Sequence, residues 1–274
     1  MDRRTARKIR LSHQDLELLG FLAEQRLALP DHAAKLLGVQ TETASTRLSK
    51  LVEGGYVKRE ALFRGKPPMY LIERDGLDVV GSSLPVPRVD LRTYEHDVGL
   101  AWLWVAARAG TFGPLGEVIS ERRMRSHDGA REPGAEPFGV RLGGLGPRGG
   151  ARLHYPDLLL QTTDGRRIAL ELELSSKGRA RLETILTGYG ADPRIDGVLY
   201  LVQSASVARL VHDTARRLGI SSLVHLQRVR LEARSPAAAH ARAAGRTAPT
   251  RPADPASPSA VAGGLPGLAA EAAL

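Results

Sequence analysis

The chain contains no cysteine among its 274 residues. This absence excludes disulfide bonds, thiolate zinc sites, iron–sulfur clusters and a cysteine nucleophile. Aromatic residues are sparse, at 4%, and charged residues interrupt the apolar runs well before the roughly 18 residues that a membrane span needs. No apolar signal core follows the basic start of the chain. We therefore expect a soluble, cytoplasmic protein that has no membrane partner.

Positive charge is in excess, with 39 lysines and arginines against 30 aspartates and glutamates, and the formal net charge is +9. Residues 1–10 form a basic arm, and the remaining charge is spread along the chain. Such a balance favours a nucleic-acid partner, although an arginine-rich composition shared by other proteins of the same source would produce the same excess. The length predicts one large domain or two small ones.

Residues 11–81 show the signals of three helices, a β-hairpin and a further helix. Ser12 can cap the first helix, with Asp15 at the position that completes a capping box. Proline favours the start of a helix and glycine its end, which places the second helix between Pro30 and Gly38. The remaining expected elements are a helix from Thr41 to Gly54, strands over 56–63 and 69–72, and a helix from Asp75. This order is typical of a winged helix-turn-helix domain.

Residues suited to DNA recognition lie on the third helix and on the hairpin. The polar residues of the helix are Gln40, Thr41, Thr43, Ser45, Thr46, Arg47 and Lys50. Amides and hydroxyls can read base edges in the major groove, and arginine can read guanine. The hairpin carries Lys58, Arg59, Arg64 and Lys66, which suit phosphates or the minor groove.

The stretch from Leu48 to Arg59 resembles the winged helix-turn-helix superfamily, in the subtype where "L..L...GYV.R" leads into the wing. The resemblance implies that the partner is double-stranded DNA, read by a monomer or by a homodimer on a palindrome. The alternative is a purely architectural or dimerising winged helix.

The rest of the chain predicts a linker, a second domain and a tail. Residues 82–91 form a proline-stiffened linker, and residues 234–274, rich in Ala, Pro, Gly and Ser, are expected to be disordered. The second domain covers 92–233, with a mobile Gly-, Pro- and Arg-rich loop over 126–150. Its expected elements are helices over 92–108, 177–188 and 207–218, and strands over 118–122, 152–160, 167–174, 197–202 and 223–226. The predicted fold class of this domain is α/β, and that of the whole chain α+β.

Carboxylates gather on one predicted hairpin of this second domain. Glu171 and Glu173 fall on the same face of its second strand, and Asp157 lies on the paired strand. Three converging carboxylates suit Mg²⁺, which can activate water and offset charge on a phosphate. Alternatively, the two glutamates face solvent on an edge strand, where charge prevents strand pairing between molecules. We expect packing roles for His96 and His154.

Pro156-Asp157, followed by Glu171-x-Glu173, resembles the "PD…(D/E)xK" motif of the restriction-endonuclease-like nuclease superfamily. The resemblance implies an α/β/α fold in which Asp157 and Glu171 hold the metal, joined by an acidic residue of the first helix, here Glu95. Glu173 occupies the position of the family's lysine, and Lys177 is the candidate for a displaced cation. This departure counts against strong hydrolytic activity.

Residues 11–230 together resemble the replication-relaxation family, which comprises DNA-binding proteins of plasmids and integrative elements. The resemblance implies a role in replication, mobilisation or transcriptional control. Two hypotheses follow: a DNA-binding protein with a catalytically silent nuclease-like domain, or a metal-dependent DNA nickase or relaxase. A relaxase would need a tyrosine nucleophile, for which Tyr155 and Tyr189 are the candidates.

Overall fold

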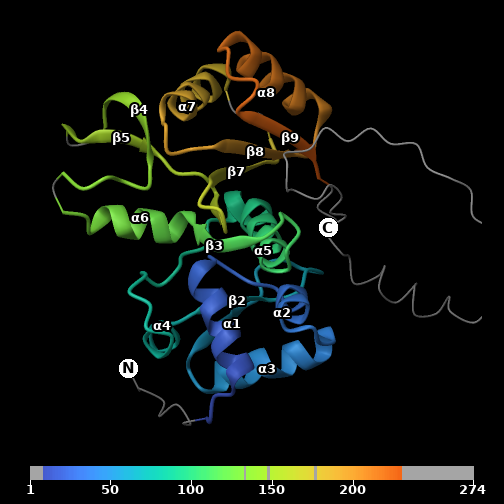
Figure 1. The fold of residues 1–274 in the computed structure, drawn as a ribbon. Helices are drawn as coiled ribbons and strands as arrows, with labels where there is room; N and C mark the ends of the chain where they lie inside the picture. The colour runs from blue at the N-terminus through green and yellow to red at the C-terminus, as the bar shows by residue number, and fades with distance from the viewer. Residues whose placement is uncertain (1–8, 133, 147–148, 176–177, 230–274) are drawn as a thin grey trace, which may run out of the picture.

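The computed structural model describes residues 9–132, 134–146, 149–175 and 178–229. It shows a mixed α/β protein built around a five-stranded mixed sheet (Figure 1). The helices are α1 His13–Glu24, α2 Pro30–Leu37, α3 Thr41–Glu53, α4 Arg74–Val79, α5 Tyr94–Arg108, α6 Glu121–Gly129, α7 Arg179–Ala191 and α8 Ala205–Arg217, with a short 3₁₀ helix, η1, at Leu91–Thr93. The strands are β1 Val57–Glu60, β2 Met69–Ile72, β3 Leu115–Ser120, β4 Val140–Leu145, β5 Ala151–His154, β6 Leu158–Thr162, β7 Arg167–Glu173, β8 Gly197–Val202 and β9 Val224–Arg228.

The first two helices begin where the signals in the sequence predict. The Ser12 hydroxyl accepts a hydrogen bond from the Asp15 backbone N–H, and the Asp15 carboxylate accepts one from the Ser12 N–H, so the predicted capping box is confirmed. Pro30 begins α2, and Gly38 ends it with a φ of +65°, a left-handed conformation that favours glycine. β1 and β2 then pair as an antiparallel hairpin ahead of α4.

The large sheet has the strand order β3-β6-β7-β8-β9. β6 runs antiparallel to both of its neighbours, β3 and β7, whereas β7, β8 and β9 run parallel to one another. Helix α5 covers one face, and its Leu103 shares a hydrophobic core with Leu18 of α1 and Leu160 of β6. Helices α7 and α8 cover the opposite face (Figure 1). The N-terminal helices and the sheet are therefore joined by one continuous core.

Two predicted segments differ in the structure. The single strand expected over 152–160 is two strands, because Pro156 interrupts the ladder and β5 pairs with β4 instead of the large sheet. The expected mobile loop over 126–150 contains the end of α6 and strand β4. The Asp128 carboxylate organises this segment by accepting hydrogen bonds from the backbone N–H groups of Phe138 and Gly139 at 2.8 and 3.0 Å.

The predicted linker over 82–91 is packed against its neighbours. Leu84 is buried in the main core, and the carbonyl of Pro85 accepts a hydrogen bond from Arg122.

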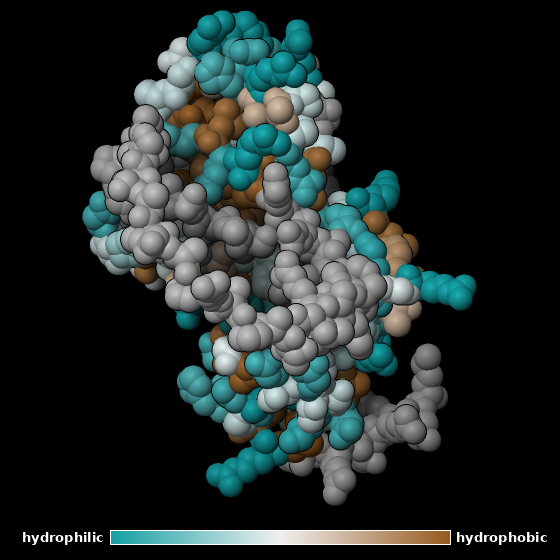
Figure 2. All heavy atoms as spheres, turned by 90° about the vertical axis from the view of Figure 1, so that its right-hand side faces the viewer, coloured by the Kyte–Doolittle hydropathy of each residue, from teal (hydrophilic) through white to brown (hydrophobic). Residues whose placement is uncertain are grey.

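Most of the predicted basic arm and the predicted tail lie outside the described residues. None of the described helices is long and apolar enough to cross a membrane. Hydrophilic side chains gather over α8 and toward the α3 end of the face shown in Figure 2, and apolar side chains show between them.

Candidate functional site

Helix α3 presents a polar face to solvent. Gln40, Thr43, Thr46 and Lys50 are exposed, whereas Thr41 and Ser45 are half-buried. The Thr41 hydroxyl donates to the Asp31 carboxylate at 2.8 Å, which ties the start of α3 to α2. The face therefore offers an amide, two hydroxyls and an ammonium group at the surface.

Arg47 occupies a different position from the predicted one. Its guanidinium lies on α1, where it donates to Asp15 at 2.8 Å, Gln14 at 2.8 Å and Ser12 at 2.9 Å. Hydrogen bonds from Ser12 and Arg47 outweigh the effect of burial and lower the pKa of Asp15. Arg47 therefore braces α1 against α3, and the expectation that it reads guanine stays a prediction.

Two of the four basic residues of the hairpin are held by glutamates. Lys58 pairs with Glu60 at 2.7 Å. Lys66 pairs with Glu95 of α5, and its ammonium lies 4.9 Å from the centre of the Tyr94 ring. Arg59 and Arg64 are exposed and form no ion pair with any residue that the structure describes. The open cations of the hairpin are therefore Arg59 and Arg64.

The first turn of α5 directs His96, and not Glu95, to the carboxylate cluster. The Glu95 side chain is 59% exposed and points to Lys66. The Nε2 atom of His96 lies 3.2 Å from the Asp157 carboxylate and 3.2 Å from the Leu172 carbonyl. Adjacent residues of a helix point about 100° apart, which is why a shift of one residue changes the partner. The predicted contribution of Glu95 to the cluster is not seen.

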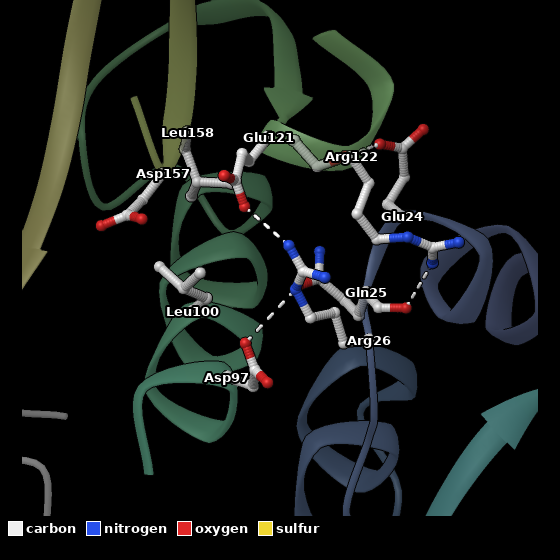
Figure 3. A pocket seen from close by; sticks show the side chains of 10 residues that line it. Glu24, Gln25, Arg26, Asp97, Leu100, Glu121, Arg122, Asp157 and Leu158 are labelled. Carbon is white, nitrogen blue, oxygen red and sulfur yellow. Dashed lines mark hydrogen bonds and ion pairs between the residues drawn. The ribbon is translucent and has the colours of Figure 1, made fainter. Parts of the chain in front are cut away.

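Glu171 and Glu173 are buried in the middle of the large sheet. They lie on β7, the central strand, and are only 1% and 6% exposed. The alternative of solvent-facing residues on an edge strand is therefore wrong. Asp157 precedes β6, and its carboxylate accepts a hydrogen bond from the Leu172 backbone N–H at 2.7 Å. Figure 3 shows this carboxylate turned away from Arg26.

Glu171 is the acceptor at the centre of a hydrogen-bonded group. His154 Nε2 lies 2.7 Å from Glu171 Oε1, and the Tyr189 hydroxyl donates to the same oxygen at 2.5 Å. His154, for which we expected a packing role, ends β5 just before the break at Pro156 and contacts Glu171 instead. Burial, reinforced by the Glu171 charge, raises the pKa of Tyr189 well above its ordinary value. A fully buried hydroxyl of this kind is poorly suited to act as a nucleophile.

Tyr155, the other candidate nucleophile, contacts side chains of α6. The Arg125 guanidinium lies 4.4 Å from the centre of its ring. Burial and the Asp128 carboxylate, which accepts its hydrogen bond, raise the pKa of Tyr155 to about 12. Neither tyrosine is therefore placed as an activated nucleophile.

The carboxylates of Asp157 and Glu171 accept hydrogen bonds from other groups of the protein. Asp157 receives the Leu172 N–H and faces His96, and Glu171 receives the Tyr189 hydroxyl and contacts His154. Within the described ranges, no group of three or more histidine, aspartate and glutamate side chains is arranged to hold a metal ion. The predicted Lys177 lies outside the described residues. The geometry on view is that of a hydrogen-bonded cluster, and the Mg²⁺ site stays a prediction.

Arg122 joins α6 to the N-terminal helices and to the segment after α4, which the sequence did not predict. It is buried and donates to the carbonyls of Ala23 and Gln25 at 2.7 Å and of Pro85 at 2.5 Å. Burial lowers the pKa of its guanidinium to about 10.

Beside Arg122, Arg26 pairs with Glu121 at 2.8 Å and with Asp97 at 3.5 Å (Figure 3). The cavity at this junction has a volume of only about 20 Å³, room for about one water molecule. These contacts lock the N-terminal helices onto the sheet.

In comparisons with known proteins, no family model and no curated protein matches the chain.

Proposed function

We propose that the protein binds double-stranded DNA through α3 and the β1–β2 hairpin, in the manner of a winged helix-turn-helix domain. The observation that carries the proposal is one exposed polar face on α3, a helix that contacts β1, together with open cations on the hairpin that β1 begins. The residues are Gln40, Thr43, Thr46 and Lys50 on α3, and Arg59 and Arg64 on the hairpin. Amides and hydroxyls suit base edges, and the cations suit phosphates.

The sheet would serve recognition or assembly on a PD-(D/E)XK nuclease-like scaffold without strong hydrolytic activity. The hydrogen bonds that engage Asp157 and Glu171 support this part of the proposal. The resemblance to the replication-relaxation family suggests plasmid or mobile-element replication, mobilisation or transcriptional control as the setting. Pairing of two copies on a palindromic site would be consistent with this mode of binding.

The test is fluorescence anisotropy with a labelled duplex of mixed sequence over a range of salt concentrations. Each phosphate contact adds about 0.9 to the slope of log K against log salt. The double variant Lys50→Ala/Arg64→Ala should therefore lower the slope by up to about 1.8. The matched control, Arg209→Ala/Arg216→Ala, removes the same charge from α8 and should leave the slope unchanged. Salt-independent binding, or equal weakening in the control, would refute the proposal.

A metal-dependent nickase or relaxase is the second candidate function. One observation favours it: the Asp157 carboxylate accepts a hydrogen bond from the backbone N–H of Leu172, the residue between Glu171 and Glu173 on β7. Binding of Mg²⁺ would require Asp157 and Glu171 to exchange their present donors for the ion. Incubation with supercoiled plasmid and Mg²⁺ or Mn²⁺ tests this candidate. Nicking that is lost in Asp157→Asn/Glu171→Gln would establish the enzyme, whereas intact plasmid with retained DNA binding would support the non-hydrolytic function.

A further inference from the structure

Strands β4 and β5 form a two-stranded ribbon that is separate from the large sheet. Its base is anchored in the hydrophobic core beneath α7 and α8, where Val140 is fully buried and Leu142 packs against the same core. β4 passes so close to Gly188 of α7 that a Cβ there would lie 2.9 Å from Leu142. The ribbon lies at the opposite end of the molecule from α3 (Figure 1).

Two cations lie on opposite faces of this ribbon. Arg141 is paired across the ladder with Leu153, and Arg152 is the neighbouring residue of β5. Because successive residues of a strand point to opposite faces, the two arginines point away from each other. Both are exposed, and neither forms an ion pair with a residue that the structure describes. The ribbon therefore carries an open guanidinium group on each face.

No acidic residue of the ribbon itself offsets these cations. The sequence has no aspartate or glutamate between Glu136 and Asp157. Glu136 pairs with Arg194 at 2.9 Å, and Asp157 accepts the hydrogen bond from Leu172, so both flanking carboxylates are engaged. The ribbon is therefore a local positive surface, which suits a phosphate backbone.

Leu145 adds an exposed apolar side chain to the outer part of the ribbon. It is 79% exposed, the largest value among the large hydrophobic residues that the structure describes. It is paired with Ala151 across the ladder, so it lies on the same face as Arg141. Single exposed leucines are common on protein surfaces, but this one shares its ribbon with two open cations.

We propose that the ribbon enters the major groove of double-stranded DNA, as a contact separate from α3 and the β1–β2 hairpin. Neighbouring strands lie about 4.8 Å apart, so a two-stranded ribbon with its side chains fits the major groove, which is about 12 Å wide. The minor groove, about 6 Å wide, is too narrow for it.

Entry by the outer end gives each of the three side chains a partner. Arg141 meets the phosphates of one DNA strand and Arg152 those of the other, because they lie on opposite faces of the ribbon. Leu145 meets the base edges, where the methyl group of thymine is the apolar partner. This contact uses none of the residues proposed for α3 and the β1–β2 hairpin, and it does not depend on them.

The test is fluorescence anisotropy of the full chain with a labelled duplex of about 40 base pairs, about four turns of DNA, over a range of salt concentrations. Arg141→Ala/Arg152→Ala should lower the slope of log K against log salt by up to about 1.8, since each phosphate contact adds about 0.9. The matched control, Arg209→Ala/Arg216→Ala on α8, should leave the slope unchanged. All four arginines are exposed, so both variants should fold.

The same substitutions in a Lys50→Ala/Arg64→Ala background separate this contact from the one proposed for α3. The ribbon variant should lower the slope there by the same amount. A slope that the ribbon variant leaves unchanged in both backgrounds would overturn the ribbon contact, even if Lys50→Ala/Arg64→Ala alone lowers the slope as expected. A loss caused by the ribbon variant alone would support the ribbon contact and refute the contact of α3.

Uracil in place of thymine tests Leu145, because it removes only methyl groups from the major groove. The wild type should bind the uracil duplex about fourfold more weakly, the value of one buried methyl group, and Leu145→Ala should lose this preference. Leu91→Ala, at another exposed leucine, should keep it. An equal preference in wild type and Leu145→Ala would overturn the proposal. Equal competition by double-stranded RNA, whose major groove is deep and narrow, would overturn it as well.

Discussion

Acidification should lower the stability of the folded protein, because His32 is buried and stays neutral in the folded state. This histidine, in the first turn of α2, is completely buried, and its Nδ1 accepts a hydrogen bond from the Leu29 backbone N–H at 3.0 Å. Its ring stands edge-on to Trp102 of α5, with ring centres 4.5 Å apart. Burial lowers the pKa of His32 from 6.5 to about 3. The folded chain therefore keeps this ring neutral at a pH where the unfolded chain protonates it.

The sign of the effect follows from that lowered pKa. Above pH 6.5 neither state binds the proton, and the neutral ring contributes its full stability. As the pH falls from 6.5 toward 3, only the unfolded state takes up the proton, so the free energy of unfolding decreases. The decrease is about 1.4 kcal/mol per pH unit, which amounts to about 2 kcal/mol between pH 7.5 and pH 5.

The assay is urea unfolding of wild type and His32→Gln at several pH values. Glutamine removes the titrating ring but can still accept the Leu29 N–H as a capping-box residue. The difference in unfolding free energy between the two proteins should shrink by about 2 kcal/mol at pH 5, because all other titrating groups cancel. The exposed His13→Gln is the control and should show no such trend. A difference for His32→Gln that does not change with pH would refute the reasoning.

Three further predictions concern arginines and lysines. Arg64→Ala and Lys50→Ala should each weaken binding to every duplex and lower the salt slope by about 0.9, as anisotropy would measure; a loss confined to one sequence would contradict this. Arg47→Ala should cost about 1–3 kcal/mol of stability in urea unfolding, since Asp15 loses a charged donor; unchanged stability with altered base preference would contradict it. Arg122→Met should lower the melting temperature, because three carbonyls lose their donor, and calorimetry would detect the change.

Helix ends and strands could be predicted from the sequence where they depend on residues only a few positions apart in the chain. Ser12 with Asp15, Pro30 and Gly38 set helix ends through bonds that span a few residues, and these boundaries are confirmed. Alternating apolar residues likewise predicted β7 and its hairpin with β6, because a strand's period of two follows from the backbone alone.

Contacts between distant segments were decided only by the tertiary structure. Arg47 and Arg122 were indistinguishable by sequence from surface cations, yet one braces α1 and the other is buried between three segments. The burial of Glu171 and its contacts with His154 and Tyr189 depend on the position of β7 inside the sheet. Sequence patterning determines which faces are apolar. Which partner each polar group meets depends on how remote elements pack, because a hydrogen bond requires a definite distance and direction between its two groups.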